Sequence, residues 1–386
     1  MKTSHLSKGF EETNPNIDLE HRPNQSRGFT SDNIAGVSPE VIAALAACNT
    51  GQALPYGNDD LTRSVEHQLA EVFEHEVDVF LVSTGSAANA LALAAVTPPW
   101  GSVLSHADAH INRDECGAPE FYTAGAKLVQ LPGRAAKIDL DALIANADRM
   151  VGDVHSVQPS SVSITQATEV GSVYQLDEIG AISEVCRSAK LPLHLDGARF
   201  ANALVTLGCS PAEMTWKAGV DLVSFGATKN GTFGVDAVVS FRKDIASALA
   251  FRRKRAGQLS SKMRFLAAQM GAYLQDGLWL RNAAHANHMA KALAAVLVSI
   301  PGVEIQQAPE ANILFCRLPK PLIRGLLDMG FGFYHDRWEP GIVRFVTSFS
   351  TPAEDVAALG RAASSLAGPA EAFLPSGDSS IAGLTP

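Results

Sequence analysis

The stretch Leu222-Val-Ser-Phe-Gly-Ala-Thr-Lys229-Asn-Gly231 joins a short apolar run to a lysine set among small residues. An apolar run that ends at a glycine is typical of a buried strand followed by a tight turn. An isolated lysine is most often a solvated surface charge. Here Gly226 and Ala227 leave room for a bulky group beside the backbone, and an amine in such a site can lose its proton and attack a carbonyl. The sequence therefore makes Lys229 a candidate nucleophile at a strand end.

Short apolar runs of the same kind recur along the chain and alternate with helical stretches, such as 87–96 and 176–189. This alternation predicts an α/β fold with a mainly parallel sheet that is buried on both faces. The expected strands of this sheet are 78–82, 102–104, 127–131, 161–165, 193–195, 222–225 and 237–241.

The pattern changes after a long helical region rich in Ala and Leu, at roughly 246–300. Candidate strands near 313–317 and 342–347 then indicate a smaller α+β unit. We expect four parts: a flexible N-terminal extension, a large cofactor-binding domain, a bridging helix with a small C-terminal domain, and a flexible tail. Their expected bounds are 1–27, 28–256, 257–368 and 369–386.

Composition excludes several classes of protein. The 386 residues are 46% hydrophobic and 18% charged, with a net charge of -9, which argues against a nucleic-acid or anionic-membrane partner. The basic run at 251–255 is best explained as a solvated helix face. The N-terminus has no apolar signal core, and no apolar stretch reaches the roughly 18 residues of a membrane helix. We expect a cytoplasmic protein with reduced thiols, because its five cysteines are scattered and form no C-x-x-C pair.

Two further segments place unusual residues at expected strand ends, where ligands bind in open α/β sheets. Ser83-Thr-Gly-Ser-Ala-Ala-Asn89 opens a helix, and its small residues and free amides suit a phosphate group. An ordinary helix N-cap explains this turn equally well. Asp196 either caps a helix or faces a pyridine nitrogen, whose protonation an anion would favour. In chain order with Lys229, these groups indicate a pyridoxal-phosphate site.

The chain resembles the threonine aldolases, in particular the bacterial low-specificity L-threonine aldolases, from about Gly28 to Gly360. These belong to the aspartate-aminotransferase-like enzymes, fold type I of the pyridoxal-phosphate enzymes. The resemblance rests on motifs at seven places: Phe29-Thr-Ser-Asp-Asn33, Tyr56-Gly-Asn-Asp59, Thr84-Gly-Ser86, His110 with Asp114-Glu-Cys-Gly-Ala-Pro-Glu120, Thr165-Gln-Ala-Thr-Glu-Val-Gly171, His194-Leu-Asp-Gly-Ala-Arg199 and Phe225-Gly-Ala-Thr-Lys-Asn-Gly231.

The resemblance implies a role for each residue around the cofactor. Lys229 would hold pyridoxal 5'-phosphate as a Schiff base, and Asp196 would pair with its pyridine nitrogen. His110 would stack on the ring and lie close to the substrate hydroxyl. The residues that would bind the cofactor phosphate are Thr84, Gly85 and Ser86.

For the substrate, the resemblance implies a clamp on the carboxylate made by Ser31, Arg199 and Arg344. Arg344 lies within a candidate strand, where a buried cation is costly unless it is paired, and a carboxylate would supply that pair. Three more residues match positions that reach a neighbouring subunit's active site. Tyr56 would contact the substrate there, and Lys262 and Arg264 would contact the cofactor, as Arg199 would within its own subunit's site. A plain surface-helix position stays an alternative for Lys262 and Arg264.

The implied reaction is cleavage of L-threonine, L-allo-threonine and related L-β-hydroxy-α-amino acids to glycine and an aldehyde, in a homotetramer built as a dimer of dimers with shared active sites. A phenylserine aldolase, a 3-hydroxyaspartate aldolase or a β-eliminating lyase are the alternatives, and a non-catalytic cofactor-binding protein is disfavoured by the intact residue set. One departure stands out. Many threonine aldolases carry His where this chain has Glu169, which leaves the base open among His110, Glu169 and a water. We expect no catalytic metal, since His285 and His288 have no third ligand nearby.

Overall fold

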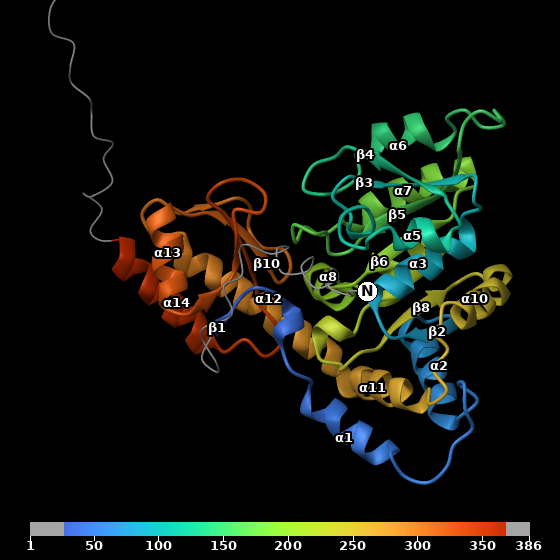
Figure 1. Ribbon diagram of the computed structural model, residues 1–386, viewed down its shortest axis with the longest axis horizontal. Helices are drawn as coiled ribbons and strands as arrows, with labels where there is room; N and C mark the ends of the chain where they lie inside the picture. Colours follow the sequence, from blue (N-terminus) through green and yellow to red (C-terminus); the bar gives the residue numbers. More distant parts are fainter. Residues whose placement is uncertain (1–26, 368–386) are drawn as a thin grey trace, which may run out of the picture.

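The protein is described by a computed structural model that covers residues 27–367, so the expected extensions at 1–27 and 369–386 lie outside it, apart from Arg27. A large lobe and a small lobe are joined by the long helix α12 (Leu278–Leu297), as Figure 1 shows. Among the described residues, no helix is long and apolar enough to cross a membrane.

A seven-stranded sheet forms the centre of the large lobe, in the order β2-β8-β7-β6-β5-β3-β4. Five strands, from β7 to β4, run parallel, and β8 is antiparallel to both of its neighbours. The predicted α/β fold with a mainly parallel sheet is therefore confirmed. The strands are β2 (Asp78–Val82), β3 (Gly101–His106), β4 (Lys127–Leu131), β5 (Gln158–Thr165), β6 (Leu193–Gly197), β7 (Leu222–Phe225) and β8 (Asp236–Ser240).

Side chains from these strands pack alternately onto two faces, because successive residues of a strand point to opposite sides. Leu222 packs with helices α3 (Gly85–Val96) and α10 (Lys243–Arg255) on one face, while the next residue, Val223, packs with α7 (Leu176–Ala189) on the other. Helix α3 is buried on every side from residue 88 to 94, which explains why this stretch is apolar apart from Asn89. Apolar runs without alternation are the consequence of this two-sided burial.

The small lobe contains a four-stranded antiparallel sheet in the order β12-β13-β10-β9. Phe29 packs against this lobe, with its ring centroid 6.1 Å from that of Phe345. The strands outside the large sheet are β1 (Arg27–Gly28), which pairs with β11 (Phe331–Gly332), and β9 (Glu304–Ile305), β10 (Ile313–Arg317), β12 (Tyr334–His335) and β13 (Ile342–Val346).

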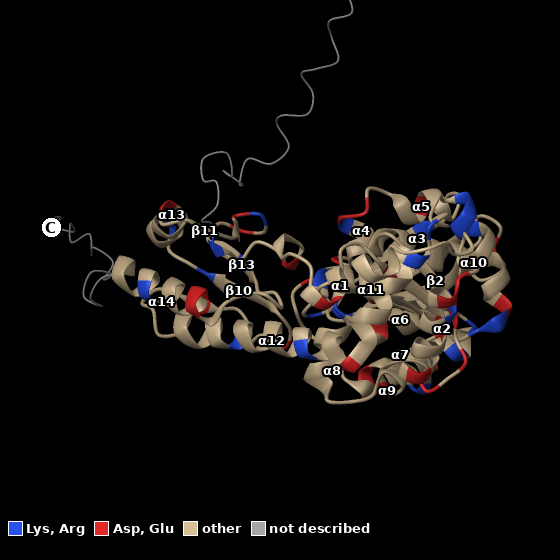
Figure 2. Ribbon diagram, turned by 90° about the horizontal axis from the view of Figure 1, so that it is seen from below, with Lys and Arg blue, Asp and Glu red and all other residues tan. Residues whose placement is uncertain are grey.

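The helical region expected at 246–300 is divided into α10, α11 (Arg264–Leu274) and α12. Asp276 and Gly277 adopt positive φ angles of 52° and 67°, which ends one helix and redirects the next. The basic run forms the last turns of α10, drawn in blue in Figure 2. The other helices are α1 (Pro39–Cys48), α2 (Asp60–Val72), α4 (His110–Arg113), α5 (Ala118–Tyr122), α6 (Leu140–Ala147), α8 (Phe200–Leu207), α9 (Pro211–Met214), α13 (Lys320–Asp328) and α14 (Ala353–Ala367), with 3-10 turns at Asp32–Ile34, Trp216–Ala218, Thr228–Asn230 and Gln275–Gly277.

Candidate active site

Lys229 lies in the 3-10 turn Thr228–Asn230, directly after β7. Asp236 holds this turn: its Oδ1 accepts hydrogen bonds from the amides of Ala227 (2.7 Å) and Thr228 (3.1 Å), and its Oδ2 accepts one from the Thr228 hydroxyl (3.1 Å). Asp236 is the first residue of β8, and because β8 runs antiparallel, its start lies at the edge where the parallel strands end. A search limited to residues that follow strands misses it.

The small residues before Lys229 have a different cause from the one expected. A Cβ atom at Gly226 would lie 2.6 Å from the carbonyl oxygen of Ala198, closer than real Cβ atoms approach. Gly226 therefore admits the backbone at the end of the neighbouring strand β6 rather than a ligand. After the lysine, the Asn230 side chain donates to the Tyr273 hydroxyl and to the Trp279 carbonyl, both at 2.8 Å.

Asp196 is only 2% exposed at the end of β6. Its Oδ2 accepts a hydrogen bond from Asn89 Nδ2 (2.9 Å) and its Oδ1 accepts one from the Ala198 amide (3.0 Å). The N-cap alternative is wrong, because helix α8 has Arg199 at its N-cap. Within residues 27–367 no cation pairs with this carboxylate. A buried anion without a cation is costly, and a protonated ring nitrogen would provide one.

The turn between β2 and α3 fits both explanations given by its sequence. The Thr84 hydroxyl accepts a hydrogen bond from the Ala87 amide (3.1 Å), so Thr84 is the N-cap of α3. The amides of Gly85 and Ser86 begin the helix and have no intrahelical acceptor, which leaves two donors at the positive end of the helix dipole. A phosphate group would satisfy both donors.

His110 opens the short helix α4 and is hydrogen-bonded through Nδ1 to Oε1 of Glu115 (2.8 Å). Burial of the imidazole disfavours its charge, but the Glu115 hydrogen bond and the negative charges of Glu169 and Asp196 outweigh this effect and raise the pKa of His110. Burial also raises the pKa of the Glu115 carboxyl, against the effect of its hydrogen bond with His110.

The two arginines of the expected clamp have different environments. Arg199 is buried and binds Asp32 in a bidentate manner, with Nε to Oδ2 at 2.7 Å and a terminal nitrogen to Oδ1 at 3.0 Å. Asp32 also accepts a hydrogen bond from the side-chain amide of Asn312 (3.0 Å). Burial alone would raise the pKa of Asp32, but Arg199 and Lys229 lower it below its usual value. The charge of Arg199 is therefore already compensated within the chain.

Arg344, on β13, has no such counter-ion among the described residues. Its Nε is buried without a hydrogen-bond partner, and one terminal nitrogen lies 3.5 Å from the Thr30 carbonyl oxygen. The guanidinium lies over the rings of Tyr334 (5.0 Å) and Trp338 (5.5 Å), which favour a cation without occupying its N–H groups. Burial lowers the pKa of Arg344. Its unpaired N–H groups fit a ligand carboxylate.

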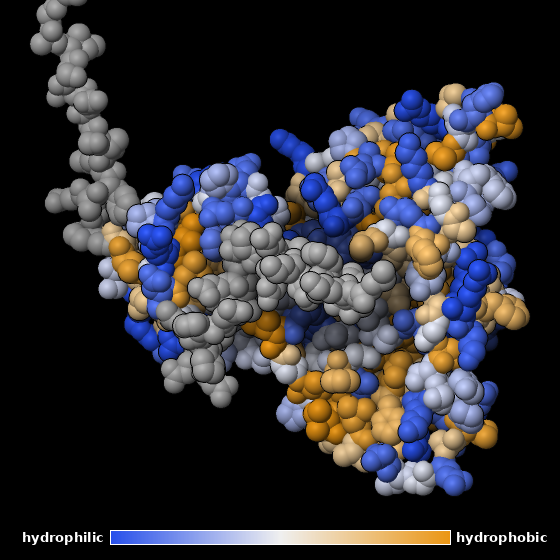
Figure 3. All heavy atoms as spheres, in the orientation of Figure 1, coloured by the Kyte–Doolittle hydropathy of each residue, from blue (hydrophilic) through white to orange (hydrophobic). Residues whose placement is uncertain are grey.

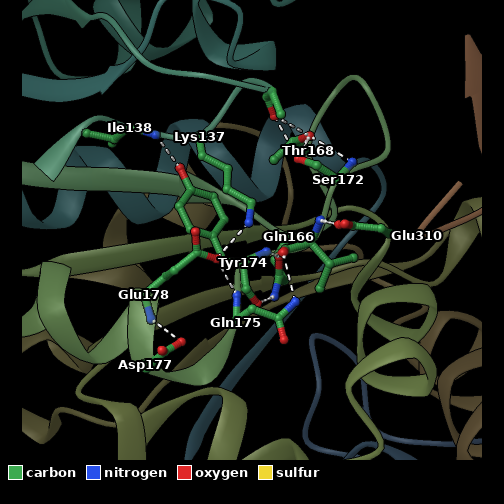
Figure 4. A network of polar contacts seen from close by, with 12 residues as sticks. Lys137, Ile138, Gln166, Thr168, Ser172, Tyr174, Gln175, Asp177, Glu178 and Glu310 are labelled. Atoms are coloured by element: carbon green, nitrogen blue, oxygen red, sulfur yellow. Dashed lines mark hydrogen bonds and ion pairs between the residues drawn. The ribbon is translucent and has the colours of Figure 1, made fainter. Parts of the chain in front are cut away.

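Glu169 lies on the loop that follows β5. Hydrogen bonds of Gln166, Thr168 and Ser172 hold this loop in place (Figure 4). The Gln166 side chain exchanges two hydrogen bonds with the backbone of Tyr174, both at 2.9 Å. Thr168 and Ser172 bond to each other through their hydroxyls (2.7 Å), and the Val173 amide donates to the Glu310 carboxylate (2.6 Å). The negative charge of Glu169 acts on His110, Arg199 and Arg344.

Tyr56 and Lys262 are exposed, and Arg264 is half-buried. Tyr56 is 45% exposed, its amide donates to the Ser261 carbonyl (3.1 Å), and Arg264 donates to the Thr50 carbonyl (3.2 Å). In the part of the chain that the structure describes, no hydrogen bond or ion pair joins these three residues to His110, Asp196 or Lys229. Ser31 accepts a hydrogen bond from the Asn33 amide (3.1 Å), beside Asp32.

Residues 28–319 match the sequence model of the beta-eliminating lyases. The chain belongs to the beta-eliminating lyase family. A low specificity L-threonine aldolase from Pseudomonas sp. strain NCIMB 10558 is 44% identical to it over 327 residues, which cover 85% of this chain and 94% of that protein. Within the family, the chain is thus similar to threonine aldolases over nearly their whole length.

Solved structures agree with this lyase family. The threonine aldolase of Leishmania major has a TM-score of 0.82 and 28% identity, and the match covers 88% of this chain and 99% of that one. The histidinol-phosphate aminotransferase of Clostridium acetobutylicum has a TM-score of 0.65 with 14% identity, covering 88% and 98%, which shows a shared fold alone. The expected fold type I and the expected cofactor are confirmed: this protein is a pyridoxal-phosphate-dependent lyase.

The site of this lyase contains residues for which no role was predicted from the sequence. Asp32 and Glu115 stand inside recognised motifs, but nothing in those motifs shows that one pairs with Arg199 and the other with His110. Asn89 is the last residue of the 83–89 segment expected to bind phosphate. Its contact with Asp196 joins residues 107 positions apart. Asp236 had no signal at all, because it lies at the start of a strand rather than at its end.

Proposed function

We propose that this lyase cleaves L-threonine, L-allo-threonine and related L-β-hydroxy-α-amino acids to glycine and an aldehyde by breaking the Cα–Cβ bond. The observation that carries the proposal is the His110 imidazole, bound to Glu115 at 2.8 Å and under the charges of Asp196 and Lys229. Aldol cleavage requires a base for the β-hydroxyl proton. The similarity to a low specificity L-threonine aldolase supports the same substrate class.

Four groups would hold the cofactor. Lys229 would bind its aldehyde carbon covalently through Nζ, and Asp196 would face its pyridine nitrogen. The phosphate would lie against Thr84, Gly85 and Ser86, where two helix amides lack an intrahelical acceptor. His110 would stack on the ring. When bound, pyridoxal phosphate supplies the electron sink for the bond that breaks at Cα.

The substrate carboxylate would be bound by Arg344, with Ser31 beside it. Arg344 is suited to this because its charge has no counter-ion among the described residues, whereas the two bonds from Arg199 to Asp32 already use one edge of that guanidinium. Arg199 adds positive potential and orients the clamp. Fixing the carboxylate decides which bond at Cα aligns with the ring, and this alignment selects the reaction.

The chemistry of the amino acid is a retro-aldol cleavage. His110, Glu169 or a water takes the β-hydroxyl proton, and the O–H electron pair becomes the second C–O bond of the aldehyde. The Cα–Cβ bond breaks, its electron pair stays on the Cα side, and a proton delivered to Cα completes glycine. A β-eliminating lyase would instead expel a β-substituent, and a phenylserine or 3-hydroxyaspartate aldolase would differ in the aldehyde released.

Two measurements test this function. The purified protein should absorb near the visible range because of its bound cofactor, and Lys229→Ala should abolish that absorbance while Lys243→Ala, which changes an exposed lysine, should not. The protein is then supplied with L-threonine, L-allo-threonine and L-phenylserine, and glycine and aldehyde are assayed. Absorbance without aldehyde from any of the three would refute the aldolase.

We also propose that the protein is a homotetramer, a dimer of dimers in which Tyr56, Lys262 and Arg264 complete a neighbour's site. Apolar side chains gather over α1 in Figure 3, and Ile42 and Leu54 are 51% and 65% exposed, which is typical of an interface. Mixing Lys229→Ala with Arg264→Ala subunits should restore activity in hybrids if sites are shared. Sedimentation should give the mass of four chains.

Two broader proposals accompany this function. Residues 28–256 would act as the cofactor-binding domain and 257–368 as a bridging helix with a small domain, which the separation of the seven-stranded sheet from the four-stranded sheet supports. Limited proteolysis should cut between them before cutting within either. We propose a cytoplasmic location, consistent with five cysteines that form no disulfide, and cell fractionation tests it.

A further inference from the structure

Four buried or half-buried side chains form a continuous hydrogen-bonded chain from His110 to Asp196. His110 Nδ1 lies 2.8 Å from Glu115 Oε1. Asn89 Nδ2 donates to the same Glu115 oxygen (2.8 Å) and to Asp196 Oδ2 (2.9 Å), so one amide group links the two carboxylates. The chain therefore connects the imidazole to the carboxylate that would face the cofactor nitrogen.

Glu115 is the unusual member of this chain. Its side chain is fully buried, whereas the imidazole of His110 is 27% exposed. An ionised carboxylate can only accept hydrogen bonds, so the Nδ1–H of His110 must donate to it. This leaves Nε2 as the ring nitrogen with a free lone pair, in a side chain that is not fully buried. The arrangement is that of a base oriented by a buried acid.

We propose that Glu115 is the positioning residue that makes His110 the base for the β-hydroxyl proton, and that Asn89 couples this pair to Asp196. The inference rests on the proposed aldol cleavage and names the base that cleavage leaves open. The proton passes from the β-hydroxyl to Nε2 of His110, while Nδ1 keeps its proton and donates to Glu115. The resulting positive charge is stabilised by the adjacent carboxylate, and the proton returns to Cα or to water after the aldehyde leaves.

Glu169 is the other candidate for the base, but no contact orients its carboxylate for that role. Its carboxylate forms no hydrogen bond or ion pair with any residue that the structure describes. Its negative charge acts on Arg199 and Arg344 as well as on His110. Glu169 therefore also influences the two arginines proposed to lie near the substrate carboxylate. A group without an orienting partner makes a poorly positioned base.

All charged groups that act on His110 enter the pH dependence. They are Glu115 after α4, Glu169 after β5, Asp196 on β6 and Lys229 after β7, while helix α3, which packs on α4, has no titratable residue. Of the three acids, Glu115 alone is hydrogen-bonded to the imidazole. A base works when deprotonated, so activity rises with pH through the pKa of His110. Because Glu115 raises that pKa, removing its charge should move the rise to lower pH.

The decisive variant is Glu115→Gln, which keeps the shape of the side chain and removes its charge. We expect kcat to fall about 10-fold or more, and the acidic limb of the kcat profile to move about one unit lower in pH, with little change in KM. The matched control is Asp108→Asn, which removes an exposed carboxylate from the same segment. Its acidic limb should not move. An unchanged limb in Glu115→Gln, with cofactor absorbance retained, would refute the proposal.

A second measurement does not depend on turnover or on any variant folding. Protein labelled with ¹⁵N-histidine, with the His110 signals assigned by His110→Gln, reports which ring nitrogen carries the proton. We expect the Nδ1–H form in the neutral imidazole, with and without cofactor. A neutral imidazole protonated at Nε2 would overturn the positioning role. If the wild-type protein releases no aldehyde, the proposed function fails first, and the tautomer still tests the Glu115–His110 geometry separately.

Discussion

Replacing Asp32 by Asn should destabilise the protein strongly, because it leaves the Arg199 guanidinium buried without its counter-ion. The side chains of the pair are 2% and 6% exposed and share two hydrogen bonds of 2.7 and 3.0 Å. Each such bond contributes about 1.5–3 kcal/mol, and breaking one partner of a buried ion pair costs about 3–5 kcal/mol. The Asn amide would also point a donor at either Arg199 or Asn312, which are donors themselves.

The assay is urea unfolding followed by tryptophan fluorescence at fixed protein and cofactor concentrations. Asp32→Asn should lower the free energy of unfolding by about 3–5 kcal/mol. Arg199→Met combined with Asp32→Leu should recover much of this loss, because neither charge is then left unpaired. A single-variant loss under about 1 kcal/mol, comparable to an exposed pair, would refute the burial argument. So would a double variant that is less stable than Asp32→Asn.

Three further predictions follow from neighbouring features. Asp236→Ala removes the acceptor of three donors around Lys229, so the dissociation constant for the cofactor should rise at least about 10-fold, and Thr228→Val, which removes one donor, should raise it less. Trp338→Leu removes a ring beside Arg344 and should raise KM about 3- to 10-fold with kcat nearly constant. Burial lowers the pKa of His194 to about 4, so the folded state binds fewer protons than the unfolded state between pH 6.5 and 4, and stability falls as pH falls through that window. The loss between pH 7 and 5, measured by urea unfolding, should be about 2 kcal/mol and should be absent in His194→Gln.

The large sheet was predictable because both of its faces are covered. Strands β2, β4 and β7 and helix α7 match the expected ranges. Burial on both faces requires continuous apolar runs in the strands and an apolar face on the helix, and both patterns are visible in the sequence. The division of the expected helical region at 256–263 was missed, although Gly257, with a φ of 73°, and the Ser260-Ser261 pair are signals that end a helix. The direction of β8 was also hidden, since the apolar run of a strand is the same in either orientation.

The site was predictable only where chemistry is carried by local motifs. Lys229, Asp196 and the β2–α3 turn lie at strand ends, as expected from the chain order. The pairing of Asp32 with Arg199 spans 167 residues, and no local pattern records such a contact. The difference between the two arginines likewise depends on which residues the fold places beside them.

The position of Asp32 has a consequence for the order in which the protein is built. This carboxylate is synthesised early, yet its partners Arg199 and Asn312 follow 167 and 280 residues later. A nascent chain that ends before Asn312 can form the whole large sheet. Its Asp32 can then bind Arg199 but not Asn312. The region proposed to bind the substrate carboxylate is therefore completed late in translation, after most of the core has formed. A ribosome stalled between these two points should carry a folded lobe that cannot yet bind an amino acid.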